Sequence, residues 1–389
     1  MTSRRGLADI RRKVEAGEPL SFDEGVLLYE SADLHTLGQL ADLVRERLHG
    51  RRAYYNVNLH INYTNYCVLR CKFCAFFRPF SKHRADEGQP VAASDGAYEL
   101  SIDEIVTRAR SAYDRGATEV HIVGGLHPKL PFSYYTGMCE AIRESCPRMH
   151  IKAFTAIEII HFSRVAKDRT TIAEVLTRLK SAGLGSLPGG GAEIFDDRVH
   201  DEAFKTKMGE SEWFEVHETA HELGIFTNAT MLYGHLESKE ERIRHLIKLR
   251  ERQERSLASR SAHFNCLVPL PFAPEGSALS HLPGTTGVED LRTLAISRLM
   301  CDNIPHVKAF WIMHSAKLAQ VSLNWGVDDI DGTVVYYDIT KRQGEGTHQE
   351  IGVDDLKRII IEAGFQPVER DSLYRPVTRE ENTWRVEGE

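Results

Sequence analysis

The sequence predicts an α/β protein built as a TIM-like (β/α)8 barrel, with a helical extension before the barrel and a cap after it. From about residue 53 onward, short apolar runs rich in β-branched residues alternate with longer stretches of helical period. Helical crossovers between successive strands imply that the strands run parallel. Eight such runs can be counted, and eight parallel strands suggest a closed or nearly closed barrel.

Residues 1–52 are expected to form the helical extension. Ser21 and Glu24 have the S-x-x-E spacing of a capping box, so a helix is expected to begin there. Residues 34–48 carry leucines on one side of a further helix. The barrel is expected to cover residues 53–340, and residues 341–389 are expected to form a C-terminal extension that packs on the barrel.

The barrel elements follow one another in a regular order. The predicted strands cover residues 57–63, 119–123, 150–155, 186–191, 226–232, 263–268, 307–313 and 333–337. Helices are expected at residues 101–115, 132–146, 171–182, 210–223 and 239–259, with a last one at 353–363 and a turn at 364–368. Glycines recur at the ends of predicted strands, where such barrels build their active sites.

Composition and charge narrow the class of protein. The 389 residues carry a formal net charge of −7, which argues against a nucleic-acid partner, because such proteins present clustered basic charge. No apolar run approaches the about 18 residues that span a bilayer, and the N-terminus lacks the apolar core of a secretory signal. We therefore expect a cytoplasmic protein without a membrane partner.

Three of the seven cysteines lie within eight residues. Cys67, Cys71 and Cys74 form a C-x3-C-x2-C motif directly after the first predicted barrel strand, with Phe73 before the last cysteine. Three thiolates on one loop can hold three irons of a [4Fe–4S] cluster and leave the fourth iron without a protein ligand. The amino and carboxylate groups of S-adenosylmethionine (SAM) can chelate such an open iron.

A zinc site is the main alternative for this motif. Zinc requires a fourth ligand, and His60 or His83 is near enough in sequence to supply it. A structural knuckle or a passive cluster-binding module is a further possibility. The position of the motif after the first barrel strand favours the open iron–sulfur cluster.

The motif and its position resemble the radical SAM superfamily, which has this cysteine spacing and an aromatic residue at the position of Phe73. The resemblance implies a [4Fe–4S] cluster and SAM as cofactors. Gly124 and Gly125 match the glycine element that meets the SAM amino group after the second strand, although Leu126 stands where a glutamate is usual.

Longer strings resemble one branch of that superfamily, the aminofutalosine synthases of menaquinone biosynthesis by the futalosine pathway. They are residues 60–65 (HINYTN), 121–128 (HIVGGLHP), 187–195 (LPGGGAEIF), 228–235 (NATMLYGH), 308–313 (KAFWIM) and 323–329 (LNWGVDD). The cyclic dehypoxanthine futalosine synthases and the deazaflavin synthase subunits are similar to parts of this pattern, so both stay open as alternatives.

The resemblance to aminofutalosine synthases implies a specific reaction. The 5′-deoxyadenosyl radical adds to the vinyl carbon of 3-[(1-carboxyvinyl)oxy]benzoate, and rearrangement with loss of a carboxylate gives aminodeoxyfutalosine. The acceptor is an aromatic enolpyruvyl ether with two carboxylates, and SAM is a consumed co-substrate. Such an enzyme also requires a reductant such as flavodoxin or ferredoxin.

Candidate site residues lie at the ends of predicted strands. The resemblance gives Glu193 a role in holding SAM through its ribose hydroxyls or amino group. His127 and His314 are the expected catalytic residues because each closely follows a predicted inner strand. Other cations at strand ends could bind the substrate carboxylates, and they are Arg78, Lys129, Arg198, His235 and Lys317.

One further pattern suggests a zinc hydrolase. His217 and His221 form an H-E-x-x-H sequence with Glu218 as the candidate base. A third ligand at the metzincin position would be Thr227, which does not suit zinc. The same segment has apolar residues at helical spacing, so an outer helix packed on the sheet is the favoured interpretation.

Overall fold

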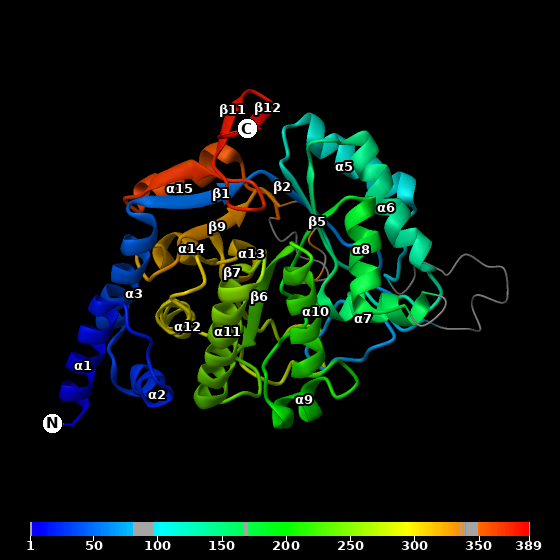
Figure 1. Ribbon diagram of the computed structural model, residues 1–389. Helices are drawn as coiled ribbons and strands as arrows, with labels where there is room; N and C mark the ends of the chain where they lie inside the picture. The colour runs from blue at the N-terminus through cyan, green and yellow to red at the C-terminus, as the bar shows by residue number, and fades with distance from the viewer. Residues whose placement is uncertain are drawn as a thin grey trace.

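The centre of the molecule is a curled parallel sheet. The computed structural model describes residues 2–80, 96–166, 170–334, 337, 339 and 349–388. Within them the sheet has seven strands in sequence order. They are β2 (Asn58–Ile61), β3 (Glu119–Ile122), β4 (His150–Ala153), β5 (Leu184–Leu187), β6 (Phe226–Tyr233), β7 (Phe264–Pro271) and β8 (His306–Val307). Helices surround this sheet (Figure 1), and the predicted α/β TIM-like fold is confirmed.

The helices of the crossovers begin at capping residues. Ser101, Thr171 and Ser238 each cap the backbone N–H three residues later, and a glutamate at that position bonds back. The predicted helices are confirmed to within one residue at each end, as α5 (Ile102–Asp114), α6 (Phe132–Ser145), α8 (Ile172–Ala182), α10 (Glu210–Glu222) and α11 (Lys239–Ser259). The sequence pattern did not predict α7 (Ala156–Val165), α9 (Asp197–Ala203), α12 (Gly287–Met300), α13 (Trp311–His314) or α14 (Ala316–Ser322).

A second, three-stranded parallel sheet lies beside the first. Its strands, in spatial order, are β10 (Gln366–Glu369), β1 (Arg52–Asn56) and β9 (Asp329–Gly332). A parallel bridge between Lys308 and Asp329 connects the end of β8 to β9, and β1 is followed at once by β2. The two sheets together therefore extend the half-barrel toward closure.

The eighth strand expected at residues 333–337 is not found where it was predicted. Thr333 and Val334 are not in a strand, and residues 335 and 336 lie outside the described part of the chain. The strand lies earlier, at β9, and pairs with β1. The strand expected at residues 307–313 is also short, because the chain enters α13 after β8.

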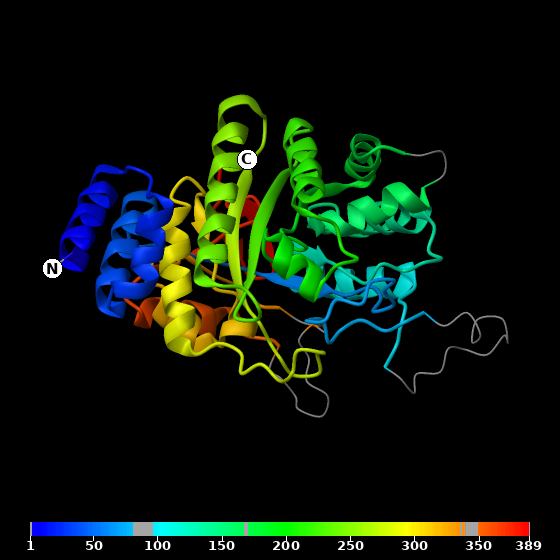
Figure 2. The same cartoon turned by 90° about the horizontal axis from the view of Figure 1, so that it is seen from below.

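The N-terminal extension is helical, as predicted. It consists of α1 (Thr2–Ala16), α2 (Phe22–Ser31) and α3 (Leu34–His49), and the capping box at Ser21 and Glu24 is present. The helices α2 and α3 pack against α11 and α12. In Figure 2 the blue N-terminal helices stand beside the yellow α12. The extension is thus attached to the outer helical layer of the barrel.

The C-terminal segment adds a helix and strands. The helix α15 (Val353–Glu362) agrees with the prediction, and Gly364 with φ of +88° ends it. The expected turn at 364–368 continues into β10, and a hairpin of β11 (Val377–Glu380) and β12 (Thr383–Val386) follows. The predicted junction near residue 341 lies outside the described residues, so the division into three segments stays a prediction.

Charged side chains are buried between the strands of the two sheets. The Nζ atom of Lys152 lies 2.6 Å from the carboxylate of Glu119, and Nζ of Lys308 lies 2.6 Å from that of Asp331. Arg370, which follows β10, lies within 4.0 Å of both carboxylates. Burial of unpaired charges is costly, so the C-terminal segment neutralises the interior of the sheet.

None of the helices in the described ranges combines the length and the apolar composition needed to cross a bilayer.

Candidate active site

The loop that carries the three cysteines is held by backbone hydrogen bonds. It follows β2, and the N–H of Cys67 donates to the carbonyl of Arg78 at 3.0 Å. The N–H of Lys72 donates to the carbonyl of Ala203 at the end of α9, at 2.8 Å. These bonds fix both halves of the loop against the rest of the barrel.

Two adjoining cavities open beside this loop. They share Phe73, Cys74, Gly191 and Ile339 as lining residues. The first, which we call the cysteine cavity, is also lined by Cys67, Cys71, Gly124, Gly125, Glu158 and Lys207. The second, which we call the central cavity, is also lined by Glu193, Thr230, Leu232, Leu270, Met313 and Tyr337. The residues predicted to bind the two cofactors therefore lie around one continuous space.

The cysteine thiols lie in surroundings that disfavour a free thiolate. Burial raises the pKa of the Cys71 thiol to about 12, and burial also raises the pKa of Cys67 and of Cys74. A thiolate here requires a positive partner such as a metal, because removal from water penalises the bare charge.

The spacing of the sulfurs bears on which metal group fits. Ligands of one tetrahedral zinc lie roughly 3.8 Å apart, given Zn–S bonds of about 2.3 Å. Among the described residues, the three cysteines do not form a group whose donor atoms all lie within 4.8 Å of one another. The wider spacing fits a multi-iron cluster, in which each thiolate binds a different iron.

The glycine pair after β3 presses closely on the cysteine loop. A Cβ atom on Gly125 would lie 2.2 Å from the carbonyl oxygen of Tyr66, and one on Gly124 would lie 2.6 Å from the ring of Tyr63. The N–H of Gly125 donates to the carbonyl of Thr64 at 2.8 Å. Only residues without a side chain allow this approach of two backbone segments.

Glu158, at the start of α7, holds the same turn from the other side. Its Oε1 accepts hydrogen bonds from the hydroxyl of Tyr63 at 2.7 Å and from the N–H of Gly124 at 3.1 Å. Burial raises the pKa of the Glu158 carboxyl to about 7. This carboxylate was not among the predicted site residues, although Thr155 and Glu158 have the spacing of a capping box.

Glu193 and Lys207 form a partly buried ion pair, and Glu193 lines the central cavity while Lys207 lines the cysteine cavity. Glu193 has a φ of +46°, in the left-handed region, after the glycines that follow β5. The Nζ atom of Lys207 also lies 5.4 Å from the ring centre of Phe73. Lys207 thus carries a positive charge beside the cysteines, and no sequence motif marked it.

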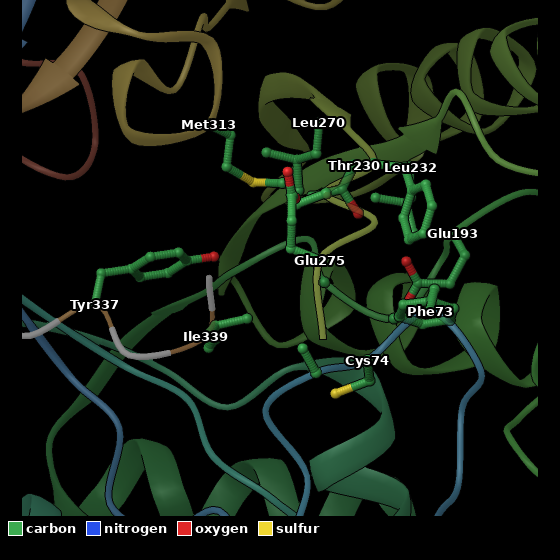
Figure 3. A pocket seen from close by; sticks show the side chains of 15 residues that line it. Phe73, Cys74, Glu193, Thr230, Leu232, Leu270, Glu275, Met313, Tyr337 and Ile339 are labelled. Carbon is green, nitrogen blue, oxygen red and sulfur yellow. The ribbon is translucent and has the colours of Figure 1, made fainter. Parts of the chain in front are cut away.

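The central cavity is mostly apolar. Figure 3 shows Leu270 and Met313 on one side, Leu232 near Thr230, and Phe73 near Glu193. Tyr337 and Glu193 lie on opposite sides of the space. Such a lining excludes water from whatever binds there.

Neither predicted catalytic histidine lines these cavities. The Nε2 atom of His127 lies 2.9 Å from the carboxylate of Glu99, and its Nδ1 accepts from the N–H groups of Lys129 and Leu130. The Nε2 atom of His314 lies 3.2 Å from the Tyr233 hydroxyl, outside both linings. Their catalytic role stays a prediction.

None of the other candidate cations is a lining residue of either cavity. Arg78 donates hydrogen bonds to the carbonyls of Phe76 and Phe77 beside the cysteine cavity. Arg198 pairs with Glu241 and Glu202, and His235 lies 3.5 Å from Glu237. Among the described residues that line the two cavities, Lys207 is the one lysine or arginine.

The H-E-x-x-H segment is part of α10, and its two histidines are buried in the core. His217 and His221 are fully buried, and His221 bonds Ser256 and Thr227 through its two ring nitrogens. Glu218 is held by arginines, Arg252 at 3.0 Å and Arg260 at 3.2 Å. No ring nitrogen of His221 is left for zinc, so the segment does not form a hydrolase site.

The remaining zinc alternatives are not supported. His60 points into the barrel interior, where it packs against His121 and Phe310. His83 lies outside the described residues. His49, His306 and Asp328 have metal-like spacing, but Arg298 occupies the Asp328 carboxylate, which argues against a cation there.

Comparisons with known proteins agree with this geometry. Residues 61–249 match the family described as Radical SAM superfamily, and residues 261–383 match the family described as CofH/MqnC C-terminal region. The chain belongs to the radical SAM superfamily. Radical SAM enzymes use a [4Fe–4S] cluster and SAM, and these are the cofactors of this protein.

Individual relatives narrow the branch. The chain is 45% identical to an aminodeoxyfutalosine synthase of Thermus thermophilus, over 96% of this chain and 98% of the relative. It is 39% identical to an aminodeoxyfutalosine synthase of Streptomyces coelicolor, over 94% and 92%. It is also 38% identical to a 5-amino-6-(D-ribitylamino)uracil–L-tyrosine 4-hydroxyphenyl transferase of Methanothermobacter thermautotrophicus, over 92% and 95%. The family match and the two aminodeoxyfutalosine synthases indicate a radical SAM enzyme of the aminodeoxyfutalosine synthase type.

Solved structures support the fold alone. Methylornithine synthase (PylB) superposes with a TM-score of 0.70 at 16% identity, covering 92% of this chain and 97% of that chain. The hydrogenase maturase HydG of Carboxydothermus hydrogenoformans superposes with a TM-score of 0.69 at 17% identity, covering 95% and 81%. The radical SAM barrel is thus shared at low identity.

Proposed function

We propose that this enzyme transfers the 5′-deoxyadenosyl radical of SAM to the enolpyruvyl double bond of 3-[(1-carboxyvinyl)oxy]benzoate. Rearrangement and decarboxylation then give aminodeoxyfutalosine for menaquinone biosynthesis. The observation that carries the proposal is the 45% identity to an aminodeoxyfutalosine synthase across 96% of the chain. The two joined cavities support it, because one has thiols and the other has an apolar wall.

The chain's own residues have separate roles in this proposal. Cys67, Cys71 and Cys74 would hold the [4Fe–4S] cluster, which supplies the electron for SAM cleavage when bound. The backbone of Gly124 and Gly125 would receive the amino group of SAM beside the cysteine loop. Their close packing on that loop supports the assignment.

Glu193 and Phe73 would complete the SAM site. Glu193 lies where the two cavities meet, so its carboxylate can accept hydrogen bonds from ribose hydroxyls. Phe73 lines both cavities and can pack against the nucleoside. Lys207 forms an ion pair with this carboxylate.

The central cavity would hold the aromatic acceptor. Its apolar wall of Leu232, Leu270 and Met313 can enclose a benzoate ring and keep water from a carbon radical. His127 and His314 are retained as catalytic candidates that act only if the site rearranges when it is loaded. A reductant such as flavodoxin or ferredoxin would supply the electron.

Product analysis tests the proposal. We expect anaerobic, reconstituted enzyme with SAM, dithionite and the enolpyruvyl benzoate to form aminodeoxyfutalosine, detected by mass spectrometry. Cys71→Ser should abolish product and iron content, whereas Cys146→Ala, in a buried cysteine remote from the motif, should retain both. If no product contains the adenosyl carbon covalently joined to the acceptor, the proposal is contradicted.

A hydrogen-abstracting sister enzyme is the second candidate. The 38% identity to a 4-hydroxyphenyl transferase favours such a sister enzyme over an enzyme from outside this group of relatives. The same incubation separates the two reactions, because abstraction releases free 5′-deoxyadenosine, whereas addition consumes the adenosyl group in the product.

The Glu193 assignment gives a separate prediction. Glu193→Gln should weaken SAM binding by roughly tenfold, because a charge-assisted hydrogen bond is lost and Lys207 is left without its partner. Equilibrium binding of SAM to the unreduced, cluster-loaded variant measures this. Glu202→Gln, in an exposed pair on α9, is the control. SAM affinity equal to that of the wild type would remove Glu193 from the site.

A further inference from the structure

Tyr337 is held firmly in the wall of the central cavity. Its side chain is 9% exposed, and its ring packs edge-on against His60 and Phe310 with centroid distances of 5.4 and 5.0 Å. Figure 3 shows its hydroxyl pointing into the cavity, with Met313 above and Ile339 below. Because two aromatic neighbours fix the ring, the direction of the hydroxyl is also fixed.

The Tyr337 hydroxyl is a donor without a partner among the described residues. The other neutral hydroxyl of the lining, on Thr230, donates to the carbonyl of Gly189 at 2.7 Å. Glu193 is occupied by Lys207. The hydroxyl oxygen is not among the fully buried polar atoms, so it faces the open space of the cavity, where a ligand can accept its hydrogen bond.

The phenol keeps its proton at neutral pH. Burial raises the pKa of Tyr337, and the nearby carboxylates of Asp331 and Glu193 raise it further. The group is therefore a neutral donor that can bond an anionic oxygen without bringing a second charge into an apolar space.

We propose that Tyr337 is a specificity-determining residue that donates a hydrogen bond to a carboxylate of the acceptor substrate. This inference rests on the proposed function, in which the acceptor is an aromatic dicarboxylate. Tyr337 lies across the central cavity from Glu193, so an acceptor would sit between the phenol and the nucleoside of SAM. Lys207, the cation of the described lining, is on the cysteine side and already paired.

Removal of the one oxygen atom tests the inference. We expect Tyr337→Phe, in cluster-loaded enzyme with SAM and no reductant, to bind 3-[(1-carboxyvinyl)oxy]benzoate at least roughly tenfold more weakly by isothermal titration calorimetry. The Kd for SAM should not change. Tyr135→Phe is the control, because it removes the same oxygen atom from a buried tyrosine that lies outside both cavities.

The outcomes separate this inference from the proposed function. Wild-type enzyme that forms the adduct, with Tyr337→Phe binding the acceptor equally well, overturns the inference alone. Weakened SAM binding by Tyr337→Phe with normal acceptor binding also overturns it, since the hydroxyl would then contact SAM. Wild-type enzyme that neither binds the acceptor nor forms the adduct overturns the proposed function and the inference with it. An unchanged melting temperature shows that Tyr337→Phe is folded.

Discussion

At the scale of single residues, Glu158 shows how a buried carboxyl can organise a binding turn. It accepts four hydrogen bonds, from Tyr63, from Gly124, and from the backbone and the hydroxyl of Thr155. The four donors come from the segments that follow β2 and β3 and from the residue that caps α7. Glu158 is thus a positioning residue that holds the glycine turn through its main chain.

The raised pKa of Glu158 predicts a pH effect on stability. Between pH about 4.5 and 7 the folded state holds the proton more tightly than the unfolded state, so the contribution of Glu158 to the free energy of unfolding falls as pH rises. The loss amounts to about 3 kcal/mol across this window. Glu158→Gln should remove that slope when denaturant unfolding is measured at both ends.

Glu174 provides the control for that measurement. It occupies the same capping-box position in α8 but is exposed, and hydrogen bonds from Thr171 lower its pKa. Glu174→Gln should therefore change the pH dependence of the free energy of unfolding in the opposite direction. A slope that survives in Glu158→Gln would show that other groups produce it.

Local patterns predicted part of the site, but not the groups that complete it. The cysteine motif and Gly124 are contiguous signals at strand ends, and the structure brings them together. Lys207 lies in a segment without such a pattern, and Tyr337 ends the strand that was predicted at residues 333–337 but was not singled out as a site residue. His127 was chosen because it closely follows a predicted strand. Its position in the sequence does not give the direction of its side chain, which turns to Glu99.

At the scale of elements, the turn after β3 and the cysteine loop act as one unit. The backbone of Gly125 lies so close to Tyr66 that any side chain at this position would displace the loop. The loop is also anchored to α9 through Lys72. The positions of the thiols therefore depend on an element that contains no ligand.

Gly125→Ala should lower the iron content of reconstituted protein. The added methyl group would lie 2.2 Å from a carbonyl oxygen, and backbone atoms cannot move aside cheaply. Iron and sulfide analysis measures the loss. Gly137→Ala, in α6, is the control, because its methyl group would meet only Ile102 at 3.5 Å. That variant should keep full iron content and gain roughly 0.5–1 kcal/mol of stability.

The misplaced eighth strand has a physical cause. The segment Asp329–Gly332 contains two aspartates and a glycine, residues that are depleted in strands. It forms β9 because Lys308 and Arg370 neutralise its buried carboxylates. Those partners are not adjacent to β9 in sequence, so the sequence pattern does not show that its aspartates are neutralised. Strand propensity therefore favoured the neighbouring residues 333–337, which are rich in β-branched and aromatic side chains. The local helix caps needed no such partners and were predicted well.

At the scale of the whole molecule, the barrel interior and the C-terminal segment depend on each other. Arg370 is fully buried and contacts Asp329 at 2.7 Å. Ser372 donates a hydrogen bond to Glu119 of β3. The segment after β10 thereby supplies partners for a buried carboxylate of the larger sheet.

Arg370→Ala should destabilise the protein by about 3–5 kcal/mol, because removal of one partner leaves buried carboxylates uncompensated. Thermal or denaturant unfolding of the purified protein measures the change. Arg385→Ala, in an exposed position of β12, should alter stability by less than about 0.5 kcal/mol. Equal stabilities of the two variants would contradict the role given to Arg370.

The pairing of β1 with β10 has a consequence for biosynthesis. Arg52 lies opposite Gln366, so a strand made early during translation must wait for one made near the end. Until then the ribosome carries a nascent chain with an open strand edge and unmatched interior carboxylates. We therefore expect the sheet of β1, β9 and β10 to close only after β10 has been synthesised, and cluster insertion to succeed only after that step.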